Sequence, residues 1–114
     1  MSHPLLTDRS ARVKQQIQRI ELMLKTLKLN SGLRPDDSAF ESTAPFCYDT
    51  MSFLEWLEWV MFPRTCEMID RGLPLPTVCE IHPLAEEEFK LIALETDSLL
   101  AEIQALDQLF NVAH

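Results

Sequence analysis

The chain has 114 residues, of which 46% are hydrophobic, and its formal net charge is −8. This length fits a single domain over residues 1–114, which buries about two thirds of its unfolded surface. The sequence contains only two glycines, which excludes glycine-rich phosphate loops and disfavours most all-β designs, because their tight turns need positive φ. The composition therefore predicts an all-α protein.

Apolar runs and cysteines bear on the cellular compartment. The most apolar stretch is interrupted by Glu55 and Glu58, so it falls short of the ~20 residues that span a bilayer. The N-terminal segment loses its apolar character after two leucines, unlike a secretory signal. Three cysteines without regular spacing fit a reducing compartment better than a disulfide framework. We therefore expect a cytoplasmic protein without membrane association.

Charge is segregated along the chain. Residues 1–34 carry a net charge of +5, residues 35–71 carry −6 and residues 72–114 carry −7. One explanation is that a basic first helix packs beside acidic helices; the other is that it meets an anionic partner. The overall negative charge disfavours direct nucleic-acid binding. Such binding would use Arg12, Arg19, Lys25 and Lys28.

The first predicted helix runs roughly from Asp8 to Leu29. Its apolar stripe repeats at intervals of four and three residues, through Val13, Ile17, Ile20, Leu24 and Leu27. The sequence Asn30-Ser31-Gly32 follows and can supply the left-handed residue that closes a helix. Residues 32–49 contain two prolines and scattered Ser, Thr and Asp, which predict a long irregular connection held down by Phe40 and Phe46.

The second predicted helix covers Ser52–Arg71, SFLEWLEWVMFPRTCEMIDR, and is apolar around most of its circumference. Such a helix is expected to be surrounded by the rest of the fold. Ser52 and Glu55 have the spacing of a capping box. Pro63 removes one backbone donor and crowds the carbonyl of Trp59, so a kink is expected. Gly72 ends the helix.

The remaining pattern predicts an extended LPLP segment and a helix from near Pro83. Apolar residues continue to Phe110, through Leu91, Leu94, Leu99, Ile103 and Leu106. Thr96-Asp97-Ser98 favours two helices with Asp97 as a cap, and one long helix is the alternative. The predicted fold is all-α, an irregular up-and-down bundle of three to four helices with a proline-kinked central helix.

The middle of the chain resembles a known family. The residues concerned are Ser42-Thr43-Ala44-Pro45-Phe46, Asp49-Thr50-Met51, the segment FLEWLEWVMFPR and the LPLP segment. They look like the YqcC-like family, small bacterial helical-bundle proteins of uncharacterised function. The resemblance covers nearly the whole chain, and it implies a link to tRNA pseudouridine synthase C, whose name is often attached to the family.

The synthase chemistry itself is not expected here. A pseudouridine synthase has a catalytic aspartate in a β-rich domain with a basic RNA cleft, whereas this chain is short, helical and acidic. The resemblance therefore implies at most a neighbour or physical partner of the synthase. We predict a non-enzymatic helical interaction module, with a protein partner that is an RNA-modifying enzyme.

The catalytic and metal-binding patterns are weak. Cys79 and His82 have C-x-x-H spacing, and Cys66 is a third candidate, but structural zinc normally needs four ligands. Glu55 and Glu58 beside the tryptophans, and the run of residues 86–88, are better explained by capping and solvation than by acid–base work. We predict no catalytic residues, no metal and no cofactor.

One constellation remains as a binding-site candidate: Asp49, Thr50, Trp56, Trp59, Pro63 and Arg64. The tryptophans are either core residues or part of an exposed groove, and Trp and Arg dominate binding hot spots. A groove would take a partner peptide or helix. The alternative function is a small-molecule-binding bundle with a pocket between the central helix and the 32–49 loop. A homodimer is also left open.

Overall fold

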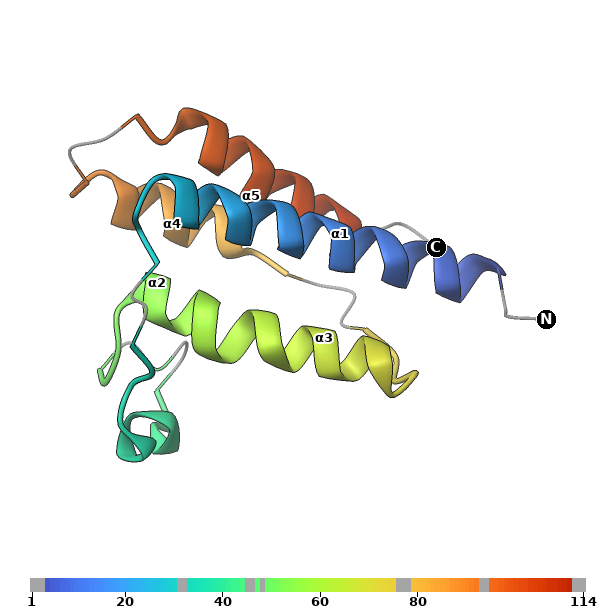
Figure 1. The fold of residues 1–114 in the computed structure, drawn as a ribbon, viewed down its shortest axis with the longest axis horizontal. Coiled ribbons are helices and arrows are strands. Elements are labelled where there is room, and N and C mark those ends of the chain that lie inside the picture. Colours follow the sequence, from blue (N-terminus) through green and yellow to red (C-terminus); the bar gives the residue numbers. More distant parts are fainter. Residues whose placement is uncertain are drawn as a thin grey trace.

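The computed structural model describes residues 4–30, 33–44, 47, 49–75, 79–92 and 95–111, with side chains from residue 9 onward. All regular structure in these residues is helical (Figure 1). The elements are α1 (Pro4–Thr26), the 3-10 turn η1 (Asp37–Glu41), α2 (Phe53–Trp56), the π-helical turn η3 (Leu57–Met61), α3 (Phe62–Asp70), α4 (Ile81–Phe89) and α5 (Asp97–Phe110). The elements α2, η3 and α3 follow one another without a gap and form one helical unit. Among the described residues, this unit packs with α1, α4 and α5, so the predicted all-α bundle is confirmed.

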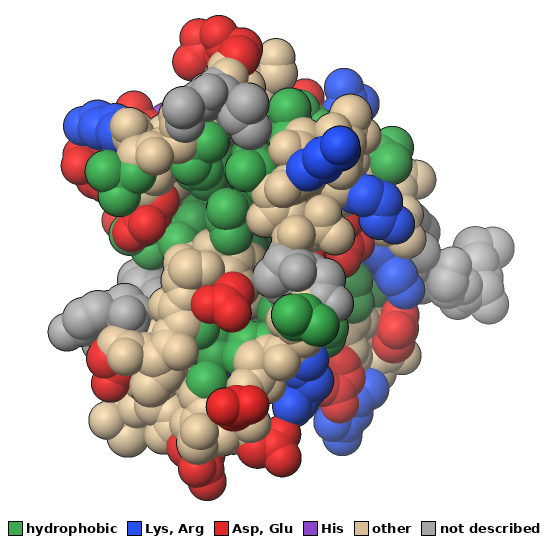
Figure 2. Space-filling model, turned by 60° about the vertical axis from the view of Figure 1, so that its left-hand side comes forward, with side chains coloured by type: hydrophobic (Ala, Val, Ile, Leu, Met, Phe, Trp, Pro, Cys, Tyr) green, Lys and Arg blue, Asp and Glu red, His purple; other side chains and the backbone are tan. Residues whose placement is uncertain are grey.

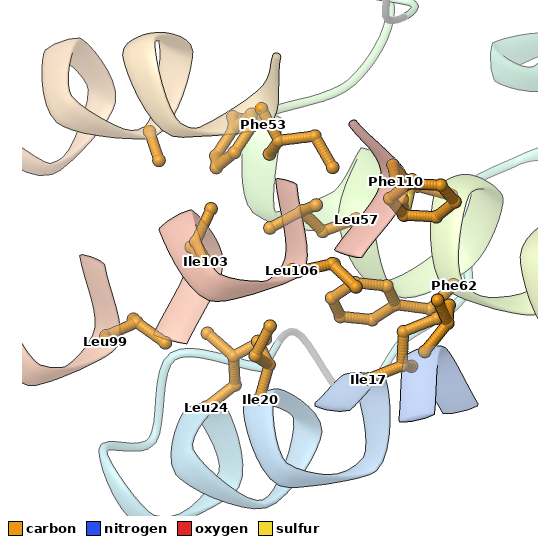
Figure 3. Packing of buried hydrophobic residues seen from close by; sticks show 14 of the residues in the cluster. Ile17, Ile20, Leu24, Phe53, Leu57, Phe62, Leu99, Ile103, Leu106 and Phe110 are labelled. Carbon is orange, nitrogen blue, oxygen red and sulfur yellow. The ribbon is translucent and has the colours of Figure 1, made fainter. Parts of the chain in front are cut away.

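Helices α1 and α5 lie side by side and antiparallel, α4 packs on α5, and α3 packs on α1 (Figure 1). The predicted stripe of α1 is in the core, since Val13, Ile17, Ile20 and Leu24 are buried and Leu27 is half-buried. Figure 3 shows side chains of α1, α2, α3 and α5 meeting in one cluster. Burial of this cluster is the main contribution to stability, at about 25 cal/mol per Å² of apolar surface.

The first helix ends earlier than predicted. Lys28 has a φ of 59°, the Leu29 N–H donates to the carbonyl of Leu24 at 2.8 Å, and the Lys28 N–H donates to Lys25 at 3.1 Å. This is a Schellman motif, in which the left-handed residue is usually glycine. Packing of Leu29 against the core favours the motif here, so Lys28 and not the Asn30–Gly32 segment closes α1. Ser31 and Gly32 lie outside the described residues. At its other end, α1 begins at Pro4 instead of Asp8, since proline fits a first helical turn.

The unit α2–η3–α3 begins as predicted. The Ser52 side chain accepts from the Glu55 N–H at 3.1 Å, and the Glu55 carboxylate accepts from the Ser52 N–H at 2.9 Å, which completes the capping box. The unit is not enclosed on most sides as expected: one face is in the core, and both tryptophans are half-buried. Gly72, with a φ of 68°, closes α3 in a second Schellman motif, as predicted.

The π-helical turn lies directly before Pro63. The Phe62 N–H donates to the carbonyl of Leu57, five residues back, where an α-helix would use four. Pro63 has no N–H to donate, so the hydrogen-bond ladder is already interrupted at this point. Prolines and π-turns are both recognised causes of a helix kink. The predicted bend of the axis remains a prediction.

The break between the last two helices is confirmed, because α4 ends at Phe89 and α5 begins at Asp97. Two details were wrong: Thr96, not Asp97, is the N-cap residue of α5, and Leu91 is 85% exposed between the helices. The α4 helix begins at Ile81, which places Pro83 in its first turn as predicted. Leu94 lies outside the described residues.

Among its described residues, the 32–49 connection includes the short 3-10 turn η1, which was not predicted. Its buried residue is Ala39, whereas the predicted anchor Phe40 is half-buried and carries the Arg34 guanidinium 4.5 Å above its ring. In the structure Phe40 makes a cation–π contact within the loop, and its role as an anchor to the bundle stays a prediction. Phe46 lies outside the described residues.

The basic first helix makes internal contacts with its acidic neighbours. Lys14 Nζ lies 2.7 Å from Asp70 of α3, and Arg19 Nε lies 3.0 Å from Glu102 of α5. Arg9 donates to the carbonyls of Leu109 and Phe110 at 3.0 and 2.7 Å, where cations are favoured by the α5 dipole. Packing of a basic helix against acidic ones thus accounts for part of the charge segregation.

Candidate functional site

An apolar groove of about 290 Å³ lies between the α2–η3–α3 unit and the segment where α4 begins and α5 ends. We call it the Trp56 groove. Its lining residues are Trp56, Val60, Met61, Arg64, Thr65, Met68, Cys79, Glu80, Ile81 and Phe110. The structure therefore brings Trp56 and Arg64 of the predicted constellation together on one surface.

The floor of the groove is built from buried side chains, and its rim is accessible. Met61, Thr65, Ile81 and Phe110 are all less than 10% exposed. Trp56 is half-buried on the rim and stacks on Phe53, with ring centroids 6.3 Å apart. The indole is thus both a core contact and a surface residue, so neither of the two predicted alternatives describes it completely.

Spacing along the helix explains one wall of the groove. Trp56, Val60, Arg64 and Met68 recur every four residues, and in a regular α-helix this spacing drifts around the axis. A π-helical turn holds more residues than an α-helical turn, so each residue in η3 rotates less around the helix axis. This smaller rotation reduces the drift and keeps the four side chains closer to one face. This repeat could have been found in the sequence. The opposite wall could not, because it combines residues 79–81 with Phe110.

The other four predicted residues do not line the groove. Asp49 accepts a hydrogen bond from the Ser42 hydroxyl, and the Thr50 hydroxyl donates to the carbonyl of Ala39 at 2.7 Å. Both contacts close the loop onto itself. Trp59 is half-buried and Pro63 is exposed on another side of the helix.

Asp107 of α5 fixes the second wall. Its side chain is 6% exposed, and its two carboxylate oxygens accept from the backbone N–H groups of Ile81 and His82 at 3.0 and 2.8 Å. These donors form the first turn of α4, which lacks a cap of its own. Asn111, one turn further along α5, bonds the Cys79 backbone N–H at 2.7 Å and its carbonyl at 2.6 Å. The start of α4 is therefore held by α5.

The Cys79 thiol is chemically quiet in this setting. Burial, together with the nearby Asp107 carboxylate, raises the pKa of Cys79 to about 12. Since the thiolate is the reactive and metal-binding form, this cysteine is suited to packing. His82 Nδ1 lies 3.3 Å from Glu86, one turn along α4. No group of three or more metal-binding side chains is found among the residues that the structure describes.

A second hollow, of about 350 Å³, lies between α1 and η3 and contains Glu21 and Glu58. Partial burial and the charge of Glu58 raise the pKa of Glu21. A third, of about 410 Å³, lies where α1 ends and α5 begins, and Figure 2 shows hydrophobic side chains gathered on this end of the bundle. A fourth hollow lies beside Arg12 and Arg19. The described residues that line the third and fourth hollows lie outside the 32–49 loop, so neither of them is the predicted loop pocket.

Comparison with known proteins identifies the family. The family described as "DUF446: tRNA pseudouridine synthase C" matches residues 12–109. The uncharacterized protein YqcC of Escherichia coli is 38% identical over 104 residues, which cover 87% of this chain and 91% of YqcC. The chain belongs to this YqcC-like family. The family resemblance found in the sequence is thereby confirmed.

One further member and a solved structure agree with the family and the fold. An uncharacterized protein of Haemophilus influenzae is 37% identical over 98 residues, 86% of this chain and 92% of that protein. The solution NMR structure of E. coli YqcC superimposes with a TM-score of 0.81 at 34% identity, over 93% of this chain and 94% of that one.

A different kind of match links the family to an enzyme. A protein of Pectobacterium carotovorum named tRNA pseudouridine synthase C is 40% identical over 68 residues. These residues are 60% of this chain but only 18% of that longer protein.

Within the described residues, no helix has the length and apolar content needed to cross a membrane.

Proposed function

We propose that this chain is a non-enzymatic interaction module of the cytoplasm that docks a protein partner in the Trp56 groove. The groove itself carries the proposal: a buried apolar floor with a tryptophan and an arginine on its rim. Trp and Arg are enriched at the energetic centres of protein interfaces. The π-helical turn that shapes this wall is a feature often found at functional sites.

The proposed partner is a tRNA pseudouridine synthase. Support comes from the Pectobacterium protein of that name, in which a segment similar to this chain makes up 18% of the length. A module and an enzyme that share one polypeptide in one organism are reasonable candidates for association as separate chains in another. The proposed role is accessory, since the described lining of the groove is mostly apolar and holds one arginine and one glutamate on opposite walls, without a recognisable catalytic set among these residues.

The test is direct binding between this chain and a purified tRNA pseudouridine synthase C, measured by isothermal titration calorimetry. We expect a 1:1 complex that weakens at least tenfold in Trp56→Ala and Arg64→Ala. Arg71→Ala is the matched control, because Arg71 lies on the exposed end of the same helical unit and outside the groove. If no complex forms with both proteins at about 50 μM, a concentration at which even a weak complex is detectable, the proposal is rejected.

The alternative, a small-molecule-binding bundle, makes a different prediction. A specific ligand raises the melting temperature in proportion to its saturation of the native state. A thermal-shift screen of metabolites and nucleotides, read for wild type and Trp56→Ala in parallel, separates the two functions. A shift that is lost in Trp56→Ala would favour a small ligand in the groove over a protein partner.

A further inference from the structure

The Trp56 groove carries one exposed charge of each sign, on opposite walls. Arg64 belongs to α3, and Glu80 directly precedes α4. Neither side chain forms an ion pair or a hydrogen bond within the described part of the chain, whereas Lys14–Asp70 and Arg19–Glu102 pair across the bundle. A bound molecule with an apolar face and two opposite charges at its edges would complement these two charges and the apolar floor between them.

The groove has the length of a short helix. Its first wall extends from Trp56 to Met68, a rise of about 18 Å along the axis, or three turns. Met61 and Met68 contribute unbranched, polarizable side chains, which adapt to different apolar anchors. An amphipathic helix with anchors at positions i, i+4 and i+7 fits such a surface.

Other occupants fit less well. RNA would require several cations, but Arg64 is the one cation among the described residues that line the groove, and the chain carries a net charge of −8. The same net charge on each copy opposes occupation by a second copy of this chain. Small-molecule sites enclose most of their ligand, whereas this groove is open along a wall of about 18 Å and would leave one side of a small molecule in solvent.

We propose that the groove binds an amphipathic helix of the partner, with an acidic side chain on the flank that faces Arg64 and a basic one on the flank that faces Glu80. This inference rests on the proposed function and specifies the partner segment at the same site. The two opposite charges fix the direction and the rotation of the bound helix, because the reversed arrangement places like charges together.

The test uses 20-residue peptides that tile tRNA pseudouridine synthase C, titrated against the full chain by fluorescence anisotropy. We expect the tightest peptide to combine a helical apolar stripe with opposite charges on its two flanks. Arg64→Glu and Glu80→Lys should each weaken it about tenfold. The double variant Arg64→Glu/Glu80→Lys should instead prefer a peptide in which the acidic and basic flank residues have been exchanged.

Controls keep the outcomes apart. Arg71→Glu and Glu87→Lys change the same charges at exposed positions outside the groove, and they should leave the affinity within twofold. If intact synthase binds but single charge reversals in the groove have no effect, the helix inference is wrong and the proposed function stands. If intact synthase does not bind wild type at all, the proposed function fails and the inference fails with it. Circular dichroism of each variant confirms that it is folded.

Discussion

Two helices of this bundle begin in different ways. The α2 helix is capped from within its own sequence, since Ser52 and Glu55 lie three residues apart and satisfy each other's backbone donors. The α4 helix is capped from another helix, by Asp107, which is 25 and 26 residues from the donors that it accepts from. The first cap needs no tertiary structure, whereas the second exists only once α4 and α5 are packed together.

The difference has a consequence for the groove. One wall of the Trp56 groove follows from a locally capped helix, and the other depends on the Asp107 and Asn111 contacts. We therefore expect the second wall to respond strongly to changes in α5, and the first wall to respond weakly to changes outside its own helix. Three experiments examine this contrast, and a fourth examines the hollow between α1 and η3.

The largest expected effect is on the reactivity of Cys79, which reports packing of the second wall. With a pKa of about 12 against an ordinary value of 9.0, the native thiol should react with iodoacetamide about a thousandfold more slowly near pH 8 than in the unfolded chain. The measurement uses Cys47→Ser/Cys66→Ser, in which Cys79 is the remaining thiol, with and without urea. Equal rates in the two conditions would show that the wall is open.

The second effect is on stability. Asp107→Ala removes both acceptors from the first turn of α4, and a hydrogen bond to a charged group contributes about 1.5–3 kcal/mol. We expect the free energy of unfolding in urea to fall by about 3 kcal/mol or more. Gln108→Ala, an exposed neighbour on the same helix, should change it by less than about 0.5 kcal/mol. A loss as small as that of the control would refute tertiary capping.

The local cap is expected to matter less. Ser52→Ala removes one side of the capping box, and such substitutions cost about 1 kcal/mol. Ser52→Thr keeps the hydroxyl and should retain most of the stability. Ser98→Ala, an exposed serine in the first turn of α5, is the control. If Ser52→Ala cost as much as Asp107→Ala, the contrast between the two helix starts would disappear.

The smallest effect concerns Glu21 in the hollow between α1 and η3. Its pKa is raised in the folded state, so the native protein holds this proton more tightly than the unfolded chain does. The ionised Glu21 carboxylate therefore lowers the free energy of unfolding. This loss is absent below the ordinary pKa of 4.5 and is fully present once the pH exceeds the raised pKa of the folded state. Glu21→Gln should raise the free energy of unfolding at pH 7 by no more than about 0.5 kcal/mol, because Glu21 is exposed, and the melting temperature should rise slightly with it. Near pH 4 the substitution should have no stabilising effect.

Glu41→Gln is the matched control for this pH dependence, because Glu41 is an exposed acid on η1, far along the chain from the hollow. The comparison uses differential scanning calorimetry at several pH values. A gain of Glu21→Gln that stays constant from pH 4 to pH 7 would mean that the carboxylate charge is not its cause.

Local rules predicted most of the helices. The 4-3-4 stripe of α1, the capping box and the closing glycine of α3 each depend on residues close together in the chain. The end of α1 was misplaced and the start of α4 was placed only approximately, for one shared reason. Lys28 adopts a left-handed conformation because Leu29 packs on the core, and α4 gains its first turn from Asp107. Neither influence is visible in the adjacent sequence.

The candidate site divides in the same way. Trp56 and Arg64 were selected from the sequence because tryptophan and arginine are typical of interfaces, and both line the groove. Asp49 and Thr50 were part of the same predicted constellation, but their side chains close the loop. Glu80 was not selected, although the structure places it on the wall opposite Arg64.

By itself, the sequence determined that this protein is a helical bundle, where its long apolar helical segments lie, and which family it resembles, because periodicity, capping and motif identity are properties of neighbouring residues. Only the tertiary structure decided that the tryptophan-bearing segment is buried on one face, and that the start of α4 completes a groove beside it. The physical reason is that a groove wall and a cross-helix cap are made by residues distant in the chain. Their contacts form when the core brings α4 and α5 together.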